Sequence, residues 1–446
     1  MMYNVKDFGA KGDGSVLDTA AIQAAIDACE KEGGGTVFVP AGRYISHSIY
    51  LKSDMMLYLE SGAVIETDPT AGGKDGVYDA GLIILRHAKH VKICGGGRLF
   101  GNDSCFVTEM KPEEKRISGP WAHPIMYKAM PDRPLMLLLE DSEYVDVEGI
   151  TISNSPVYAA KIDRCHHMNF IGVHVLNRGD MPNSDGFHFG SCTYVNVVGC
   201  EFICGDDCIA IDSCRGGESH HFTISGCNFD STVNAFRIFT GLDAQHIPDY
   251  PHLNVHDVVA CGCSCNCSGV FNLTALNGDI YNVSMNGFAI NTDPERLGNC
   301  AYLMTHKGGK IYDCMFSNVV ARHNGAVTII GEDGYSIHDI DFDNWRMCIT
   351  PMEKGYGMDM PDPLGGGYWL HHYAPYGVYL RHAKDIRFRN VNLTWGEGGN
   401  VKLPLPAMKI DRCENIETNG LNDPPKMVYR STKWGAAQAQ YQNTCK

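Results

Sequence analysis

The sequence predicts an all-β fold, a right-handed parallel β-helix with a short N-terminal capping helix. Short segments of the form apolar-x-apolar recur along the 446 residues, and four successive ones begin near residues 144, 168, 194 and 221, which are 24, 26 and 27 residues apart. No helical pattern stands between them for a βαβ crossover, and 49 glycines spread along the chain suit many tight turns. A β-sandwich or a propeller is the alternative, but neither explains similar single-strand motifs at the spacing of one coil.

Residues 1–45 are expected to form a cap region that contains a strand, a glycine-rich turn and one helix. Asp18 or Thr19 is the expected N-cap, and the three glycines at 33–35 end the helix. Such a helix could cover the open hydrophobic end of a repeat fold. The apolar positions that recur at helical spacing are Ala20, Ile22, Ala25, Ile26 and Cys29.

The repeated strand motifs continue to a last one near residue 385, and two stretches depart from them. Residues 111–134 and 352–375 are expected to leave the coils as loop insertions near a groove, because long loops in compact domains tend to be functional. The whole chain, residues 1–446, is interpreted as a single β-helix domain.

Composition narrows the set of partners and the compartment. The net charge is −15 and no run of Lys or Arg occurs, so nucleic acid and an anionic membrane surface are not expected as partners. A homo-oligomer stays open. The nineteen cysteines are odd in number and follow no visible secretory signal, which favours reduced thiols in a cytoplasm.

Three carboxylates stand out in the middle of the chain. Asp185 and Asp206 are 21 residues apart, and Asp207 follows directly. On successive coils, equivalent positions stack at roughly 4.8 Å, so we expect Asp185 and Asp206 to be neighbours. The preceding Gly205 predicts a turn or bulge that lets both members of the pair reach the same groove.

Acids that lie so close should raise one another's pKa values, so that one keeps its proton near neutrality. A carboxylic acid that protonates a leaving oxygen, beside a carboxylate that directs water, is what glycosidic bond cleavage requires. The alternative is that the three acids bind a calcium ion or cap turns.

The motifs around these acids resemble the polygalacturonase family, glycoside hydrolase family 28. They are N-S-D-G-F at 183–187 and G-D-D-C-I-A-I at 205–211; the opening FGAKGDG and the passage around Arg133 and 154–156 are also similar to bacterial members. The resemblance implies an inverting hydrolysis of pectin-related sugars without a metal or other cofactor. It also implies that Asp206 is the general acid, that Asp185 and Asp207 activate water, and that Asn183 orients the sugar or the acid.

The sequence departs from the family pattern where the sugar carboxylate would be held. Asn234 stands in place of the family's His, and Asn272 lies within the three positions of its Arg-Ile-Lys motif. Arg237 could replace the missing clamp, because Arg pairs bidentately with carboxylates, or it could be structural. The departure favours a neutral or differently charged sugar over simple galacturonate.

Further candidates for sugar binding are histidines and aromatic residues. His188 lies on the Asp185 strand and faces the opposite way from Phe187, and His221 could assist the acid in place of the missing His. The rings on the two insertions that could stack on a sugar are Trp121, Tyr368, Trp369, His371 and His372.

The sequence leaves several functions open. The expected one is an exo-acting glycoside hydrolase that meets imported oligosaccharides. A lyase, an epimerase or a sugar transferase can use the same fold, and so can a non-catalytic carbohydrate-binding β-helix. The alternating cysteines from Cys261 to Cys267 are interpreted as a buried row on one strand face and not as a zinc site, so no metal is expected.

Overall fold

The computed structural model describes residues 1–111, 116–118, 123–125, 127–241, 251–293, 296, 298–350, 377–396, 408–418, 421, 427–431 and 437–441. Their contacts group into two compact units. The first holds Met1–Arg116, Pro124–Ala210 and His221–Ser231, and the second holds Ile117–His123, Ile211–His220 and Thr232–Lys446. The interpretation of the chain as one domain stays a prediction.

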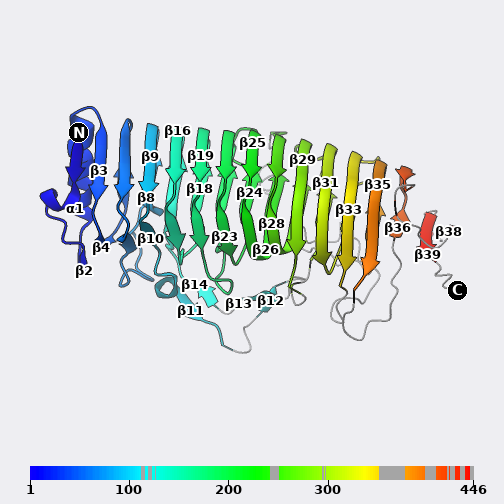
Figure 1. The fold of residues 1–446 in the computed structure, drawn as a ribbon, viewed down its shortest axis with the longest axis horizontal. Helices are drawn as coiled ribbons and strands as arrows, with labels where there is room; N and C mark the ends of the chain where they lie inside the picture. Colours follow the sequence, from blue (N-terminus) through cyan, green and yellow to red (C-terminus); the bar gives the residue numbers. More distant parts are fainter. Residues whose placement is uncertain are drawn as a thin grey trace. The chain divides into compact units, whose positions relative to one another are not determined.

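The first unit is built from three series of parallel strands, in which each strand pairs with its counterpart one coil later (Figure 1). The first series is β5 (Ile49–Leu51), β8 (Gly81–Arg86), β15 (Leu135–Glu140), β18 (Ala160–Asp163), β21 (Phe187–Gly190) and β24 (Ile209–Asp212). The second series is β1 (Met2–Asn4), β3 (Gly35–Val39), β6 (Met55–Leu59), β9 (Lys89–Gly95), β16 (Glu143–Glu148), β19 (His166–Ile171), β22 (Thr193–Val198) and β25 (Ser219–Ser225). The third series is β2 (Asp13–Leu17), β4 (Gly42–Ser46), β7 (Ala63–Thr67), β10 (Arg98–Phe100), β17 (Thr151–Ser153), β20 (His174–Leu176), β23 (Glu201–Cys204) and the start of β26 (Asn228–Thr240).

The register shows why the sequence repeats about every 25 residues. Val145 pairs with Val91 on one side and with Met168 on the other, and Met168 pairs with Val195. All four are buried, so each coil adds one apolar side chain to the same interior row. The predicted parallel β-helix is confirmed, and the motifs near 144, 168, 194 and 221 begin successive strands of the second series.

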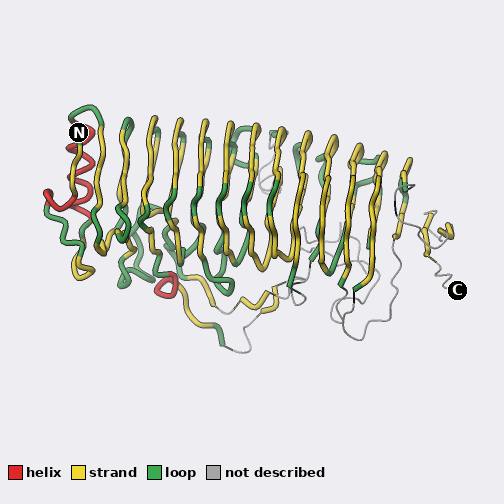
Figure 2. Tube along the Cα trace, viewed as in Figure 1, coloured by secondary structure: helices red, strands yellow, loops and turns green. Residues whose placement is uncertain are grey.

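The predicted helix is α1 (Thr19–Lys31), and within the described residues it is the single α-helix (Figure 2). It contacts β1, β3 and β5 through Ile22, Ala25, Ile26 and Cys29, which are buried. Ala20, which was expected on the same stripe, is exposed. Asp18 precedes the helix, but its carboxylate accepts hydrogen bonds from Lys11 N and Gly12 N and does not cap the helix.

The second unit also consists of parallel strands, and several of them are longer. One series is β27 (Val255–Cys261), β29 (Ile280–Asn291), β31 (Ile311–His323), β33 (Ile337–Ile349), β35 (Ala383–Trp395) and β37 (Glu414–Glu417). The other is the later part of β26, β28 (Ser264–Ala275), β30 (Ala301–Thr305), β32 (Val327–Ile330), β34 (Val378–Arg381) and β36 (Met408–Asp411).

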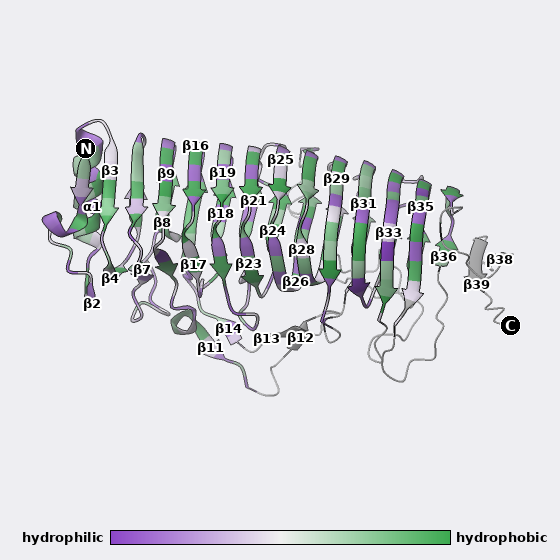
Figure 3. Ribbon diagram, in the orientation of Figure 1, coloured by the Kyte–Doolittle hydropathy of each residue, from purple (hydrophilic) through white to green (hydrophobic). Residues whose placement is uncertain are grey.

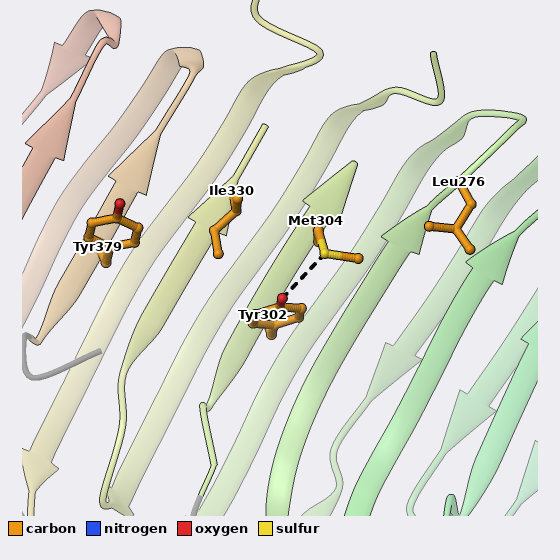
Figure 4. Close-up of a cluster of buried hydrophobic side chains, with 5 residues drawn as sticks. All are labelled: Leu276, Tyr302, Met304, Ile330 and Tyr379. Atoms are coloured by element: carbon orange, nitrogen blue, oxygen red, sulfur yellow. Dashed lines mark hydrogen bonds between the residues drawn. The ribbon is translucent and has the colours of Figure 1, made fainter. Parts of the chain in front are cut away.

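Strands of both units mix hydrophobic and hydrophilic residues along their length (Figure 3), as expected when alternate side chains point to opposite faces. On β30, Leu303 is fully buried, yet Tyr302 and Met304 on the opposite face are also covered. These two belong to a cluster in which the Tyr302 hydroxyl donates to Met304 Sδ at 3.4 Å (Figure 4). The cluster consists of Leu276, Tyr302, Met304, Ile330 and Tyr379. Apolar packing in this unit therefore occurs on both faces of a strand.

The insertions are only partly described. Within 111–134 lie three short strands: β12 (Arg116–Ser118) pairs with β13 (His123–Ile125), and β14 (Tyr127–Ala129) pairs with β11 (Val107–Glu109). The insertion therefore contains regular structure as well as loop. The second insertion, 352–375, lies outside the described residues.

The remaining described elements are η1 (Val5–Phe8), η2 (Asp103–Phe106) and the antiparallel pair β38 (Met427–Ser431) and β39 (Ala437–Tyr441). In the part of the chain that the structure describes, no helix has the length and apolar character needed to span a membrane.

The alternating cysteines do not share one strand face, so that expectation was wrong. Cys261 ends β27, and Gly262 follows with a φ of 64° that turns the chain before β28. Cys263, Cys265 and Cys267 are buried and Cys261 is partly exposed. Alternation alone could not distinguish one straight strand from two strands joined at a glycine.

Buried His323 at the end of β31 gives a stability prediction. Its Nδ1 accepts a hydrogen bond from Gly325 N at 3.0 Å, and burial lowers the pKa of its imidazole to about 4. As the pH falls below the ordinary value near 6.5, the unfolded chain binds a proton that the folded chain does not. The free energy of unfolding should therefore fall, by on the order of 3 kcal/mol once the pH is below about 4.

Urea unfolding of the wild type and His323→Gln between these pH values checks this, because the Gln variant keeps a hydrogen-bond acceptor and does not titrate. The difference in unfolding free energy between the two proteins should shrink as the pH falls. Parallel pH profiles would show that His323 is not held neutral by the fold.

Candidate active site

The three predicted carboxylates lie at the starts of two paired coils of the first unit. Asp185 precedes β21, and Asp206 and Asp207 precede β24. Gly186 N donates to Asp207 O at 2.8 Å, and Phe187 N donates to Cys208 O at 3.0 Å, so the two coils are in backbone contact at the acids. One carboxylate oxygen from each of the three residues lies within 4.8 Å of the other two.

The three acids differ in exposure. Asp185 is 4% exposed and Asp207 is 7% exposed, whereas Asp206 is only partly buried. Asp206 Oδ1 accepts a hydrogen bond from Asp207 N at 3.1 Å, which fixes the side chain of the more accessible acid. Three oxygens this close could also ligate a cation, although calcium needs six to eight oxygen ligands.

Gly205 allows the two turns that carry the acids to approach each other closely. Its N donates to Ser184 Oγ at 3.0 Å, and Ser184 Oγ donates to Arg178 O at 2.9 Å. A Cβ at Gly205 would lie 2.4 Å from Ser184 Oγ and 2.8 Å from Arg178 O, so a larger residue would push the turns apart. The predicted turn before the Asp pair is therefore observed, and Ser184 is a positioning residue that the sequence did not single out.

Two further side chains hold the Asp185 turn. Asn177 Nδ2 donates to Asp185 O at 3.2 Å, and Asn177 Oδ1 accepts from Ser155 N at 3.0 Å. Arg133 Nη2 donates to Asn183 Oδ1 at 3.0 Å, and Asn183 has a φ of 54°. Asn183 is thus placed beside the acids by an arginine 50 residues earlier, a relation that no local motif could reveal.

His188 lies on β21, one coil after Lys161 on β18, with which it pairs. It is largely buried, and its ring stacks on that of Tyr158 with centroids 5.2 Å apart at 20°. Phe187 instead packs against Phe170 in the core, so the two neighbours do face opposite ways. The role of His188 in sugar binding stays a prediction.

Asn234, Asn272 and Arg237 lie in the second unit. Asn234 is 0% exposed and Asn272 is 1% exposed, and Asn272 Nδ2 donates to Asn234 Oδ1 at 3.4 Å. Arg237 is buried, with its guanidinium carbon 5.2 Å from the ring centroid of Phe239. The two amides are therefore bonded to each other, and whether any of the three residues contacts a sugar stays a prediction.

His221 belongs to a row of stacked rings on the second strand series. Its ring lies 4.7 Å from that of Tyr194, which lies 4.8 Å from that of His167. His167 in turn stacks on Tyr144 at 4.7 Å, and Tyr144 stacks on His90. The structure thus places His221 in a ring stack. Trp369, like the other predicted rings of the second insertion, lies outside the described residues.

The fold and these acids define a parallel β-helix protein with a carboxylate cluster on adjacent coils. Residues 29–231 match the family model described as Glycosyl hydrolases family 28. The match covers slightly less than half of the chain and agrees with the resemblance to this family that the motifs indicated. The matched region includes Asp185, Asp206 and Asp207 and ends before Asn234.

Individual relatives are distant. A probable polygalacturonase of Vitis vinifera is 28% identical over 227 residues, which cover 46% of this chain and 43% of that protein. Alginate lyase 7 of Azotobacter vinelandii is 57% identical over 65 residues, which cover 15% of this chain and 8% of the lyase. The chain thus spans less than half the length of these two curated relatives.

Among solved structures, the family 28 exopolygalacturonase of Yersinia enterocolitica is similar with a TM-score of 0.67 at 18% identity, over 94% of this chain and 78% of that chain. At this identity the likeness shows the fold alone.

Proposed function

We propose that this protein is a glycoside hydrolase that cleaves a pectin-related oligosaccharide by an inverting mechanism without a metal ion. The observation that carries the proposal is the approach of three carboxylate oxygens, from three residues on two adjacent coils, to within 4.8 Å of one another. The match of residues 29–231 to the model of glycosyl hydrolases family 28 supports the same chemistry.

In the proposed reaction, Asp206 gives its proton to the glycosidic oxygen as the bond from that oxygen to the anomeric carbon breaks. Asp185 and Asp207 accept hydrogen bonds from a water molecule, and one takes its proton as the water oxygen bonds to the anomeric carbon. The exposures fit these roles, because the acid must reach the substrate and Asp206 is the most accessible of the three.

The stereochemical part of the proposal rests on the number of acids. Carboxyl groups of inverting enzymes are typically about 6.5–9.5 Å apart, and those of retaining enzymes about 5–5.5 Å. The 4.8 Å limit applies to one oxygen of each acid and not to the separation of the carboxyl groups, so it favours neither outcome. A pair of carboxylates that bracket one water, with a third as the acid, is an arrangement for direct displacement by water.

The proposed substrate is an oligosaccharide of plant origin, attacked from one end. The family's Arg-Ile-Lys motif is missing at its expected place, where Asn272 stands, which supports a sugar other than simple galacturonate as one part of that substrate. We propose a reducing compartment, the cytoplasm, because the eighteen cysteines that the structure describes are not assigned to disulfide bonds.

The test is an assay of reducing ends and product masses on a panel of pectic and neutral plant oligosaccharides, run with and without EDTA. Release of a saturated sugar at the same rate in both is the expected result. An unsaturated product that absorbs in the ultraviolet would assign the protein to the lyases. Sugar binding without turnover of any panel member would instead favour a carbohydrate-binding β-helix.

A further inference from the structure

A hollow of about 670 Å³ lies on the outer face of the second strand series of the first unit. It crosses four adjacent strands, β9, β16, β19 and β22, whereas the three acids precede β21 and β24 of the first series. Its volume is within the range of about 300–1,000 Å³ that is usual for small-ligand sites. Because each coil contributes one strand, the hollow extends along the direction in which the coils stack, and it suits an elongated ligand.

One side of the hollow is a row of four stacked rings from four successive coils. Neighbouring ring centroids are 4.7 to 5.3 Å apart. The ring faces cover one another, so the rings turn mainly their edges toward the hollow, and the two tyrosines are nearly half exposed. The four residues of this ring row are His90, Tyr144, His167 and Tyr194.

The ring row stands on an unfavourable backbone. The φ angles of its four residues lie between 56° and 58°, in the left-handed region that bulky side chains rarely adopt. In the second unit, the residues that directly precede the first buried position of a strand motif have the same backbone, but they are of the types that tolerate it best: Asp257, Asn282, Asp313 and Asp339. The first unit therefore places rings where Asp or Asn would cost less.

Ring stacking by itself does not require this backbone. His256, Tyr281 and Tyr312 of the second unit stack from the position one residue earlier, where φ is not positive. Strained positions gather at functional sites, and an observed outlier is a reason to look for a function. The strain of the ring row thus points to a role for these rings in the hollow that they line.

Polar side chains form a second row in the hollow, two residues after the rings. Asn196 Nδ2 donates to Asn169 Oδ1 at 2.9 Å, and Asn169 Nδ2 donates to Asp146 Oδ1 at 2.8 Å. An amide group has two N–H donors, so in the described part of the chain each Asn keeps one donor for a ligand. The ladder fixes both amides in advance, which reduces the entropy that a ligand must overcome on binding.

Beyond the polar row the surface becomes aliphatic. Ile171 and Val198 follow Asn169 and Asn196 by two residues, pair with each other in register and are exposed. Hydrogen-bonding groups therefore lie between ring edges on one side and aliphatic side chains on the other. A sugar chain combines C–H groups with lines of hydroxyls, and it matches this order of surfaces.

The repeat distance of the two rows distinguishes a sugar chain from a peptide. The rows advance by one coil at a time, roughly 4.8 Å. An extended peptide presents equivalent side chains every two residues, about 6.6 Å, so it would fall out of step within two coils. One sugar unit of an extended glycan is close to one coil in length, so successive sugars can meet successive rings and amides.

The charges around the hollow favour a neutral ligand. Its walls hold one lysine and one aspartate. Lys92 Nζ pairs with Glu148 at 2.6 Å, and the carboxylate of Asp146 accepts the hydrogen bond from Asn169. Each charge already has a partner, so neither an acidic nor a basic chain would gain a strong attraction here.

We propose that this hollow binds a neutral glycan in an extended conformation, with hydroxyls on Asn169 and Asn196 and C–H groups against the ring row. The site contains no member of the acid cluster. Its role is to hold the protein on a neutral polysaccharide, and this role does not depend on the reaction proposed for the acids.

Isothermal titration in an Asp206→Asn background, which prevents turnover, tests the inference. The probes are the hexasaccharides of glucose, mannose and xylose with β-1,4 linkages, which are neutral and extended, and maltohexaose, whose α-1,4 linkages make it coil. We expect the best β-linked probe to bind at least about tenfold more tightly than maltohexaose. Its affinity should change by no more than about twofold between roughly 0.05 and 0.5 M salt, because no charges pair.

Tyr144→Asn removes one ring and supplies a residue that tolerates the left-handed backbone. It should lower the affinity for the best probe at least about tenfold. The midpoint of urea unfolding should change little, because relief of the backbone strain offsets the lost ring contacts. Asn196→Ala should lower the affinity about two- to tenfold, the net worth of one hydrogen bond between neutral groups.

Tyr281→Asn is the matched control, because it removes the middle ring of another stack outside this hollow. The Tyr281 ring lies 4.7 Å from that of His256 and 5.1 Å from that of Tyr312. This variant should leave the affinity for the probe unchanged.

Failure of all three β-linked probes to bind, equal affinity for maltohexaose, or equal effects of Tyr144→Asn and Tyr281→Asn would overturn the inference. A steep loss of affinity with salt would reject a neutral ligand. Loss of stability in Tyr144→Asn without loss of affinity would make the ring row a structural support only. Turnover in the wild type judges the proposed function separately: hydrolysis without binding here would keep that function and reject this site, and binding here without turnover would do the reverse.

Discussion

Asp206→Asn should lower the rate of oligosaccharide hydrolysis by about 10²–10⁴-fold, the usual contribution of a general acid. The amide cannot give a proton to the leaving oxygen. The fold should survive, because Asn Oδ1 can still accept the hydrogen bond from Asp207 N. Initial rates on the best substrate of the panel, with unfolding midpoints measured beside them, check both statements.

The role of Asp206 can be separated from those of Asp185 and Asp207 by changing the leaving group. An aryl glycoside with an acidic phenol needs little protonation, so Asp206→Asn should recover much of the lost rate on it. Asp185→Asn and Asp207→Asn should remain slow, because water would still lack its base. Asp146→Asn is the control, because Asp146 belongs to the same unit. Its Oδ1 accepts a hydrogen bond from Asn169 Nδ2 at 2.8 Å, and this bond involves no acid of the cluster. Equal losses on both substrates for Asp206→Asn would assign the proton to another residue.

Gly186→Ala should remove activity because it disturbs the backbone contact between the two coils that carry the acids. A Cβ at this position would lie 2.2 Å from Cys208 O and 2.7 Å from Phe202 Cδ1, so the two coils must separate. Overpacking of this kind typically costs about 1–3 kcal/mol of stability. A shift of the catalytic groups by about 1 Å can cost on the order of 10²-fold in rate.

Gly199→Ala is the matched control for that change. Gly199 has a φ of 62°, and a Cβ there would meet nothing within 4 Å, so the cost is roughly 1–2 kcal/mol of backbone strain. Both variants should be destabilised by similar amounts in urea unfolding, and only Gly186→Ala should lose activity. If the two lost activity alike, general destabilisation would explain the result.

The fold could be predicted from the sequence because the same physical constraint acts on every coil. Each coil must place apolar side chains in the same interior rows, as Val145, Met168 and Val195 do, so the motif returns after every turn of the chain. The same periodicity predicted that Asp185 and Asp206 would meet. Gly205 indicated the turn that brings Asp207 to the same place.

The other residues that position the site are held by contacts that do not recur from coil to coil, so the repeat pattern could not predict them. Arg133 reaches Asn183 from an insertion 50 residues earlier, and only the folded chain shows that its other partners are carbonyls. Asn177 and Ser184 looked like ordinary turn residues, and their buried hydrogen bonds became visible only when the coils were stacked.

The position of His221 could have been anticipated. A His or Tyr occupies the residue before the first apolar position of five strand motifs, and these rings form the stack. They are His90, Tyr144, His167, Tyr194 and His221.

The central claim is a single displacement by water at the three acids, and the anomeric form of the first product tests it most directly. Proton NMR during the first minutes of hydrolysis of an α-linked substrate from the panel would follow the anomeric proton before mutarotation. The account predicts that the β anomer forms first and that the α anomer grows in later. Initial formation of the α anomer would show two displacements through a covalent intermediate and would contradict the proposed roles of Asp185 and Asp207.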